Sequence, residues 1–509
     1  MAEEPLSERV NRKKRAEAGH QSIPRKVWAN RSPILDINKH IAAYQVDLLE
    51  MARTDDQPPR KASGAGLCAF LERSNPRSLS GGRMAFVRGD THALAQLSGR
   101  TDWKGTLVFD FDLSTPEGKD IAGLLRSLDG EKAGFSFCLS NASPMLGLSA
   151  SDPPCGCPGG KSPRPASKVP GLPPHLGSLG LETIKPLLSS GCFVKIDVAH
   201  RKKGELEAIV PAFRNLPVRM VAKSVDTWED FAVCSRLGFE LFHGAFFRKP
   251  SALARSSVSP NHALLLDLST RAAHDEDIQN IEEIFKKNPD LTFGLFNLVR
   301  SAYFHVSKDV TSIKQAITML GYKNLQKWAA LMLFTINHSD PSSNPLFENV
   351  LVRAATMELA ASKLRRKGLG DAAYMTGILS LVPALFDVPM EEMVAKANFG
   401  EEIREALLRG AGPLGAMLAV VEGLEQGDYE KCGERTGEVD IGLESFLSAQ
   451  ATAFADCCAL THSQDGDKPV KEGPSRQPGQ KSPQSSKIHC GPSPQPSWLK
   501  KVRSFFHLR

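Results

Sequence analysis

The sequence predicts an α/β half followed by an all-α half, with disordered tails. Two observations carry this prediction. Six strand-like runs alternate with helix-length spacers between residues 84 and 247, and such alternation favours a parallel sheet closed into a barrel. Residues 289–334 instead carry apolar side chains at spacings of three and four, which is the period of packed helices.

The strand-like runs locate the candidate chemistry of the first half. In a parallel barrel, catalytic and binding side chains sit at the C-terminal ends of the strands, so the residues that close each run are the candidates. The runs are MAFVR (84–88), TLVFDFD (106–112), GFSFCLS (134–140), CFVKIDV (192–198), VRMVAKSV (218–225) and FELFHGAFF (239–247).

The helical stretch divides into three short helices joined by tight turns. Gly321 would end the second helix, and Asp309 or Thr311 would cap its start. The buried stripes consist of Leu291, Leu295, Leu298 and Val299, then Ile313, Ile317 and Leu320, then Leu325, Trp328, Ala329, Met332 and Leu333.

Composition bounds the class of protein. The chain has 509 residues, enough for two or three domains, and its 63 basic and 57 acidic side chains leave a net charge of only +6. This charge is too mild to predict nucleic-acid binding. The chain lacks a run of about 18 uninterrupted apolar residues and the apolar core of a secretory signal, so we expect a cytoplasmic protein.

Polar, Pro-rich and Ser-rich segments set the predicted boundaries, because their composition cannot offset the entropy of ordering. The predicted parts are a disordered basic tail (1–24), the barrel (25–252) with a disordered insertion (141–178), a helical domain (257–460), a disordered linker (461–494) and a terminal helix (495–509).

Ten cysteines at wide spacings predict reduced thiols rather than a disulfide framework. Cys155 and Cys157 lie in the Pro- and Gly-rich insertion, where they could bind a metal or oxidise. Two ligands without companions make a poor metal site, so the sequence assigns them no role.

The helical half resembles the HDOD family, a helical domain related to the HD and HD-GYP phosphohydrolases that lacks their metal-binding His and Asp residues. The resemblance rests on 289–334, on the run from Glu401, and on Tyr374, Gly377, Leu379, Ser380, Leu381 and Phe386, and it covers about 257–456. It implies that this half binds partners and has no metal-dependent activity.

Histidines in the helical half give no metal pattern of their own. His274 and Asp275 precede a helix start, where Asp275 or Asp277 is better explained as an N-cap. The remaining candidates, His262, His305 and His338, are isolated. A concentration of unpaired charge around Lys314, Lys323 and Lys327 is a weak indication of a partner surface.

The first half resembles the EAL domain, whose complete members hydrolyse cyclic di-GMP with two divalent metals held by carboxylates and an Asn. Together the two halves resemble EAL-HDOD signalling proteins. The matching segments occur in family order: the opening strand at Ala29–Leu49, then GGRMAFVR (81–88), FVKID (193–197), VAKSVDT (221–227) and FHGAFF (242–247).

This resemblance implies a degenerate EAL domain. It places Gln45 at the signature Glu, Arg88 at the metal-binding Asn, Lys223 at the Glu that acts as base, and His243 at the Gln, with the Asp-Asp pair lost within 138–141. Family-like chemistry remains at Lys195, Asp197 and Asp226, and at Asp110.

Arg88 and Lys223 would put positive charge where the two metals should sit. A like charge within about 4 Å costs on the order of 4 kcal/mol at an effective interior dielectric. Two-metal hydrolysis also needs both ions to activate water and hold the phosphate. We therefore expect no metal, no cofactor and no catalytic residues.

Two interpretations of this altered pocket compete. In one, a basic pocket binds an anionic nucleotide without metal, through Arg88, Lys195, Asp197, Lys223 and His243. In the other, these are ordinary polar side chains, and Lys195 pairs with Asp197 or Asp110. The second interpretation is favoured.

The chain ends in a predicted basic amphipathic helix. Trp498, Leu499, Val502, Phe505 and Phe506 fall at helical spacing, with Lys500, Lys501, Arg503 and Arg509 between or after them. So short a helix should dock on an anionic membrane surface, a partner's groove or this protein's own domains.

We therefore predict a non-enzymatic bacterial signalling protein that acts as a protein-interaction scaffold or regulator in a cyclic di-GMP-related pathway. The alternatives are a metal-independent effector that binds cyclic di-GMP, and a residual cyclic di-GMP phosphodiesterase. Expected partners are signalling proteins, with cyclic di-GMP and peripheral membrane contact as further candidates and no nucleic acid.

Overall fold

A computed structural model gives the fold of most of the chain. It describes residues 27–461 except for 52–58, 75–78, 91–92, 94–105, 113–133, 140–192, 200, 202, 215, 217, 252–259, 301–309, 311, 336–343, 365 and 397–398.

Several predicted features lie outside the described residues. These are the tail 1–24, the insertion 141–178 with Cys155 and Cys157, nearly all of the linker 461–494, and the terminal helix 495–509. The predicted boundaries of these segments stay predictions.

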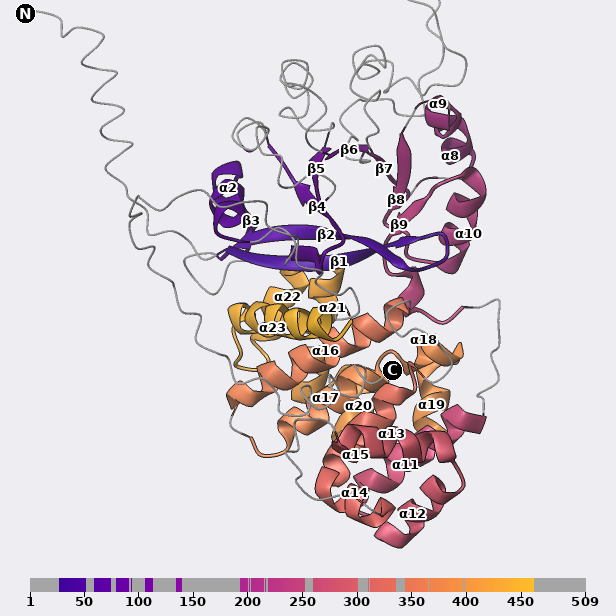
Figure 1. Cartoon of the computed structure of the whole chain (residues 1–509). Helices are drawn as coiled ribbons and strands as arrows, with labels where there is room; N and C mark the ends of the chain where they lie inside the picture. The colour runs from indigo at the N-terminus through magenta and orange to yellow at the C-terminus, as the bar shows by residue number, and fades with distance from the viewer. Residues whose placement is uncertain are drawn as a thin grey trace, which may run out of the picture.

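The described residues form two stacked parts, a strand-rich part above and a helical part below (Figure 1). The strands are β1 (Val27–Asp36), β2 (Ile41–Glu50), β3 (Arg60–Lys61), β4 (Met84–Arg88), β5 (Leu107–Asp112), β6 (Gly134–Leu139), β7 (Phe193–Asp197), β8 (Arg219–Lys223) and β9 (Leu241–His243). The helices beside them are α2 (Gly64–Arg73), α8 (Lys203–Ile209), α9 (Pro211–Arg214), α10 (Trp228–Leu237) and the 3-10 turn η1 (Phe246–Arg248).

The helical part runs from Pro260 to Thr461. Its first helices are α11 (Pro260–Ala273), α12 (Ile278–Lys286), α13 (Pro289–Arg300), α14 (Ile313–Leu320), α15 (Tyr322–Met332) and α16 (Pro345–Ala361), followed by the 3-10 turn η4 (Ser362–Leu364). The later helices are α17 (Leu369–Leu379), α18 (Val382–Phe386), α19 (Met390–Lys396), α20 (Glu401–Arg409), α21 (Gly412–Gln426), α22 (Tyr429–Thr436) and α23 (Leu443–Thr461).

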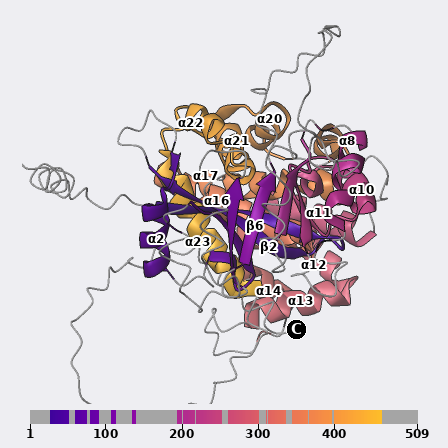
Figure 2. The ribbon, with the colours of Figure 1, turned by 90° about the horizontal axis from the view of Figure 1, so that it is seen from above.

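Strand pairing closes the sheet into a ring of eight strands. The order is β1-β9-β8-β7-β6-β5-β4-β2, and β1 also pairs with β2, while β3 adds to the outer edge of β2. Strand β1 is antiparallel to both neighbours, and β2 and β4 to β9 are mutually parallel. The predicted fold class is confirmed, and the six predicted runs are β4 to β9. Seen from above, α2 and the pair α8 and α10 lie on opposite sides of these strands (Figure 2).

The segment Ala29–Leu49, predicted as one opening strand, is instead a hairpin. Strands β1 and β2 are joined by a turn at 37–40, in which Lys39 has φ +67°. The Asp36 carboxylate accepts the backbone N–H of His40 at 2.8 Å, and the Asp36 carbonyl accepts that of Lys39 at 2.9 Å. These local hydrogen bonds reverse the chain without Gly or Pro, which is why the turn escaped the prediction.

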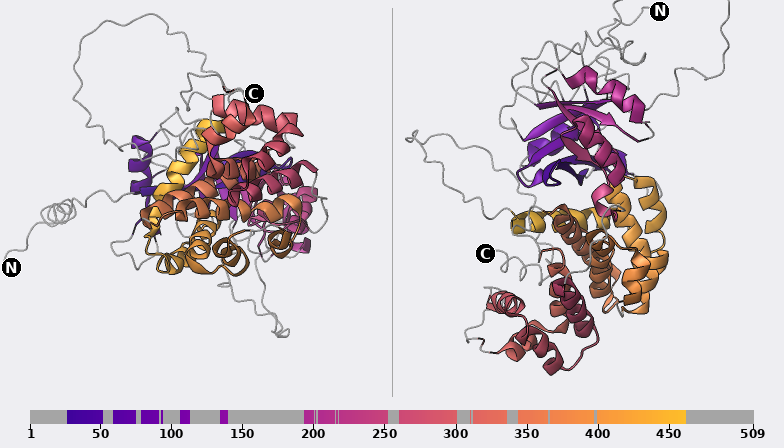
Figure 3. Two further views of the ribbon diagram at one scale, coloured as in Figure 1. Left: turned by 90° about the horizontal axis from the view of Figure 1, so that it is seen from below. Right: turned by 90° about the vertical axis from the view of Figure 1, so that its right-hand side faces the viewer.

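The helical part packs against the β1–β2 hairpin. Helices α21 and α23 lie against β1, and two further views show the helical part on one side of the barrel only (Figure 3). The ring of Tyr44 on β2 meets that of Phe454 on α23 edge to face, with centroids 5.3 Å apart. A separate apolar cluster fills the inside of the barrel and consists of Ile34, Ala43, Phe86, Val108, Phe193, Val221 and Leu241.

The three short helices predicted within 289–334 are α13, α14 and α15. Gly321 ends α14 as predicted, with φ +77°. The N-cap of α14 is Ser312, whose hydroxyl accepts the backbone N–H of Gln315 at 3.1 Å. The prediction of Asp309 or Thr311 was wrong, because the helix begins at Ile313 and the residue directly before it is the cap.

One stretch, Leu369–Phe386, has the length and composition of a membrane-spanning helix, but 72% of it is buried in the protein. Helices α20 and α21, bent by 43°, pass the same test only if they are taken together. The burial identifies the first stretch as part of the core of the helical part.

Gly244 should tolerate no side chain. A Cβ there would lie 2.0 Å from the carbonyl oxygen of Val225, so we expect Gly244→Ala to lower the free energy of unfolding by about 2–3 kcal/mol. A Cβ at Gly433, exposed in α22, meets nothing within 4 Å, and Gly433→Ala should raise it by about 0.5–1 kcal/mol. Urea denaturation measures both, and equal effects would contradict the close approach at Gly244.

Candidate functional site

Parallel register brings the predicted site residues to one end of the barrel. Arg88 on β4 lies beside Asp110 on β5, Asp197 on β7 lies beside Lys223 on β8, and Lys223 lies beside His243 on β9. Side chains opposite each other in register share one face of a sheet, and here they close the C-terminal end of the barrel.

Lys195 lies inside the barrel with only 1% of its surface exposed. Its ammonium donates to Gln45 Oε1 at 2.6 Å and to Asp110 Oδ2 at 2.5 Å, and it lies 4.8 Å from the centre of the Phe86 ring. Of the two predicted partners of Lys195, the structure therefore chooses Asp110 and not Asp197. A fixed positive charge occupies the centre of the candidate site.

Asp197 forms a second lysine pair. Its Oδ2 lies 3.2 Å from the Lys223 ammonium. Burial opposes the charge on Lys223, but the negative charges of Asp197 and Asp110 and the hydrogen bond to Asp197 favour it, and the Lys223 pKa is raised above its ordinary value. Lys223 therefore remains protonated and neutralises Asp197.

Asp112 and Ser136, which were not among the predicted site residues, share this end of the barrel. Asp112 lies beside Cys138, and Ser136 lies beside Asp110, in the β5–β6 pairing. Asp110 Oδ1 and Ser136 Oγ are buried with no hydrogen-bond partner among the described residues. Alternation along β5 could have identified Asp112, because it lies two residues after Asp110 and thus on the same face.

Cys138 is a buried thiol at the same end. Burial, together with the negative charge of Asp110, raises the pKa of Cys138 to about 12. It is therefore a neutral thiol, unsuited to act as a nucleophile.

These residues do not fit the two-metal centre that the EAL resemblance implies. Such a centre needs several carboxylate oxygens in close array. Here Lys195 holds Asp110 and Lys223 holds Asp197. Across the part of the chain that the structure describes, no group of three or more His, Cys, Asp or Glu side chains could hold a metal ion. Arg88, at the end of β4, is exposed.

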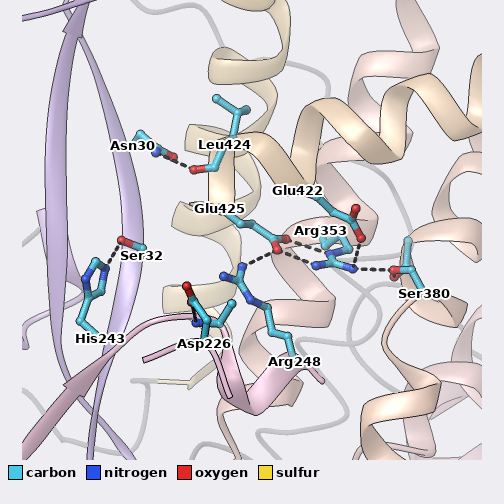
Figure 4. A network of polar contacts seen from close by, with 12 residues as sticks. Asn30, Ser32, Asp226, His243, Arg248, Arg353, Ser380, Glu422, Leu424 and Glu425 are labelled. Atoms are coloured by element: carbon cyan, nitrogen blue, oxygen red, sulfur yellow. Dashed lines mark hydrogen bonds and ion pairs between the residues drawn. The ribbon is translucent and has the colours of Figure 1, made fainter. Parts of the chain in front are cut away.

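His243 lies between the candidate site and the hairpin. Its Nε2 is 2.8 Å from the hydroxyl of Ser32 on β1 (Figure 4). Burial lowers the pKa of His243 to about 3, with a further contribution from the positive charges of Lys195 and Lys223. The imidazole is therefore neutral near pH 7.

The turns that follow β8 and β9 interlock. Asp226 Oδ1 accepts the backbone N–H of Ala245 at 2.9 Å, and Val225 exchanges backbone hydrogen bonds with His243 and Phe246. Asp226 was expected to keep family-like chemistry, and the structure gives it this backbone contact. Lys223 and His243 are thereby tied to the start of η1.

Arg248, at the end of η1, enters the helical part. Its Nη1 lies 2.6 Å from Glu425 Oε2 on α21 (Figure 4). Arg353 on α16 binds both oxygens of Glu425, at 2.9 and 2.5 Å, and donates to Ser380 at 2.7 Å. Burial alone would raise the pKa of Glu425, but Arg353 and Arg248 outweigh it and lower the pKa. A buried ion triad thus joins the two parts.

Neither of the two candidate histidines that the structure describes in the helical part, His262 and His274, belongs to a group that could hold a metal. His262 is buried against the ring of Phe386, with Nε2 3.1 Å from the carbonyl oxygen of Leu333. His274 is exposed, and the N-cap of α12 is Asp277, one of the two predicted caps. The other two histidine candidates, at 305 and 338, lie outside the described residues.

The prediction of unpaired charge was wrong for Lys323 and Lys327, whereas Lys314 is exposed and forms no ion pair with a described residue. Lys327 is buried and pairs with Glu358 at 2.6 Å and Asp371 at 2.7 Å, and Lys323 pairs with Asp371 at 2.6 Å. The carboxylates come from α16 and α17, far from the lysines in sequence. This cluster therefore gives no indication of a partner surface.

Residues 262–397 match the family model of the HDOD domain. The helical part thus contains an HDOD domain, as predicted from the sequence, and it follows a barrel, as the predicted EAL-HDOD architecture requires.

Two curated proteins resemble the chain. The chain is 27% identical over 228 residues to "Cyclic di-GMP phosphodiesterase CdgJ" of Vibrio cholerae, a match that covers 44% of this chain and 52% of CdgJ. It is 24% identical over 274 residues to "Uncharacterized protein YuxH" of Bacillus subtilis, covering 53% of this chain and 66% of YuxH. The chain thus spans about half the length of CdgJ.

Solved structures with some likeness include two EAL proteins. The EAL domain of Xanthomonas citri FimX in complex with c-diGMP matches at a TM-score of 0.26 and 13% identity, covering 47% of this chain and 92% of that one. Bacillus subtilis YkuI, in complex with its substrate c-di-GMP and calcium, matches at a TM-score of 0.29 and 11% identity, covering 58% of this chain and 71% of that one. TM-scores this low carry no argument about the fold. The barrel is defined by the strand pairing of this chain itself.

Replacing His243 by Gln should flatten the acid side of the stability curve. Because the folded pKa of about 3 lies below the ordinary 6.5, the unfolded chain binds the extra proton between these values, and wild-type stability falls as the pH is lowered through this window. His243→Gln should remove up to about 1.4 kcal/mol per pH unit from that slope. Urea denaturation across the window measures it, with exposed His274→Gln as the control, and parallel curves for His243→Gln and wild type would contradict the shift.

Glu425→Gln should destabilise the protein strongly, because it leaves Arg248 and Arg353 buried without a full counter-charge. We expect a loss of about 3–5 kcal/mol in the free energy of unfolding. The control is Glu240→Gln, whose partner Arg219 is 45% exposed, and it should cost less than about 1 kcal/mol. Similar losses in the two variants would argue against the triad as a buried link.

Proposed function

We propose that this chain is a cytoplasmic, non-enzymatic signalling protein that acts through binding, as a scaffold or regulator in a cyclic di-GMP-related pathway. The observation that carries the proposal is the Lys223 ammonium, which lies 3.2 Å from Asp197 Oδ2 at the position where the EAL resemblance implies a Glu base. Together with the Lys195–Asp110 pair, it leaves two of the carboxylates at this end neutralised by lysine.

The pathway is proposed from the relatives. One curated relative is named a cyclic di-GMP phosphodiesterase, and the EAL and HDOD resemblances belong to the same kind of signalling. The HDOD domain would supply the surface for protein partners. The ion triad of Arg248, Glu425 and Arg353 would couple the conformation of the barrel to that of the HDOD domain, because it joins η1 to α16 and α21.

A second candidate is an effector that binds cyclic di-GMP without metal. Arg88 is exposed and the Lys223 side chain is 35% exposed at the same end, so both could meet phosphate oxygens. The unpartnered atoms Asp110 Oδ1 and Ser136 Oγ could accept and donate hydrogen bonds to a ligand. This candidate is also non-enzymatic, and it differs from the first in that its barrel binds cyclic di-GMP.

Calorimetry with cyclic di-GMP, with and without magnesium, separates these candidates when the same samples are analysed for hydrolysis. We expect no turnover under either condition, because the carboxylates that would bind metal are paired with lysines. Magnesium-dependent turnover would overturn the proposal and favour residual phosphodiesterase activity, to which the name of CdgJ points.

Saturable binding without turnover would identify the effector. In that case Arg88→Ala with Lys223→Ala should weaken binding by about 3 kcal/mol, or roughly 100-fold, because two charge-assisted hydrogen bonds are lost. The control is Lys203→Ala, which removes an exposed lysine on α8 and should leave binding unchanged. Unchanged affinity in the double variant would place the ligand elsewhere.

A further inference from the structure

Helix α13 of the helical part exposes an aromatic side chain. Phe293 on α13 is 66% exposed, more than the other large apolar side chains exposed among the described residues, Ile37 at 52% and Leu408 at 37%. Asp290 lies one turn before it, and the partly buried Phe296 one turn after it, on the same side of the helix. Covering Phe293 would remove a substantial apolar area from water.

The sequence that leads up to Phe293 is acidic although the chain as a whole is basic. Residues 267–293 contain seven carboxylates and three basic side chains, a net charge of −4, whereas the whole chain carries +6. The three basic side chains, Arg271, Lys286 and Lys287, form ion pairs within this stretch. Asp275, Asp277 and Asp290 are exposed and form no ion pair with any described residue. We call the surface formed by 275–293 the α12–α13 face.

Residues 495–509 have the complementary character. They contain four basic side chains and no acidic one, a net charge of +4, and they carry Trp498, Phe505 and Phe506 at helical spacing. A helix as short as this segment cannot bury its apolar stripe by itself. On the α12–α13 face, Phe293 is exposed, and Asp275, Asp277 and Asp290 form no ion pair with a described residue.

The chain is long enough to join the two. Helix α23 ends at Thr461, so 33 residues connect it to the segment 495–509. Such a connection can extend to about 110 Å, several times the roughly 28 Å length of α23 itself. Tethering also supplies an effective concentration in the millimolar range, so even a weak contact is occupied within one chain.

We infer that residues 495–509 dock on the α12–α13 face of the same chain and cover Phe293. The aromatic stripe would meet Phe293, and Lys500, Lys501 and Arg503 would meet the carboxylates around it. A membrane surface or a partner protein would then have to compete with this internal contact for the segment.

Hydrogen–deuterium exchange on the full-length chain tests the docking. We expect amides of 498–506 to exchange at least 10-fold more slowly in the wild type than in Phe293→Ser. The controls are Ile37→Ser and Leu408→Ser, which change exposed apolar side chains outside the α12–α13 face and should keep the wild-type protection. Thermal unfolding of each variant verifies that Phe293→Ser is folded.

A charge exchange tests the same contact independently. Lys500→Glu with Lys501→Glu should abolish the protection, and adding Asp275→Lys with Asp290→Lys, which leaves the N-cap Asp277 in place, should restore it. Protection in the wild type that Phe293→Ser leaves intact, or the absence of protection, would overturn the inference. Protection that grows with protein concentration would assign the contact to a second copy, and protection that appears only with phosphatidylglycerol vesicles would assign the segment to a membrane. Both results would also overturn it.

Discussion

The β1–β2 hairpin is the constraint on which the rest of the structure depends, because one of its faces contacts the barrel interior and the other contacts the helical part. Ser32 and Gln45 point to the polar end of the barrel interior, where they contact His243 and Lys195. The opposite face presents Tyr44 and Arg31 to Phe454 of α23. A shift of register by one residue would exchange these faces and disrupt the barrel interior and the packing of the helical part together.

At the far end of the hairpin, Asn30 and Asp47 both contact the hydroxyl of Tyr429, and Asn30 also donates to the carbonyl oxygen of Leu424 (Figure 4). With the triad around Glu425, these contacts make one polar seam between the parts. Burial raises the pKa of Glu348, across the seam from Arg83 at 3.2 Å, to about 8. The two parts are thus joined by apolar packing and by buried polar groups that need each other as partners.

The interior of the barrel depends on one buried ammonium. Removing Lys195 from water is costly, and Asp110, Gln45 and the face of Phe86 together compensate for it. Because this cation is covalently attached, Asp110 and Gln45 need no bound ion as their partner. This arrangement is in keeping with the proposed role in binding.

Much of this fold follows from local sequence. The runs that became β4 to β9 and the helices between 289 and 334 follow from periodicity alone, which is a local property. The pairing of Lys195 with Asp110 rather than Asp197 does not follow from local sequence. It depends on the register of β5, β6 and β7, and β7 lies far from β5 along the chain. The contact of Arg248 with Glu425 joins residues 177 positions apart, and no local pattern could predict it. The lysine pairs of α15 were missed for the same reason.

The central claim is that a lysine ammonium occupies the barrel end where the EAL resemblance implies metals. Anomalous diffraction from crystals of the full-length chain soaked in manganese chloride tests this most directly. The account predicts electron density for the Lys223 ammonium beside Asp197 and for the Lys195 ammonium beside Asp110, with no manganese peak at the C-terminal ends of the strands. A manganese peak coordinated by Asp110 or Asp197, with either lysine displaced, would contradict it.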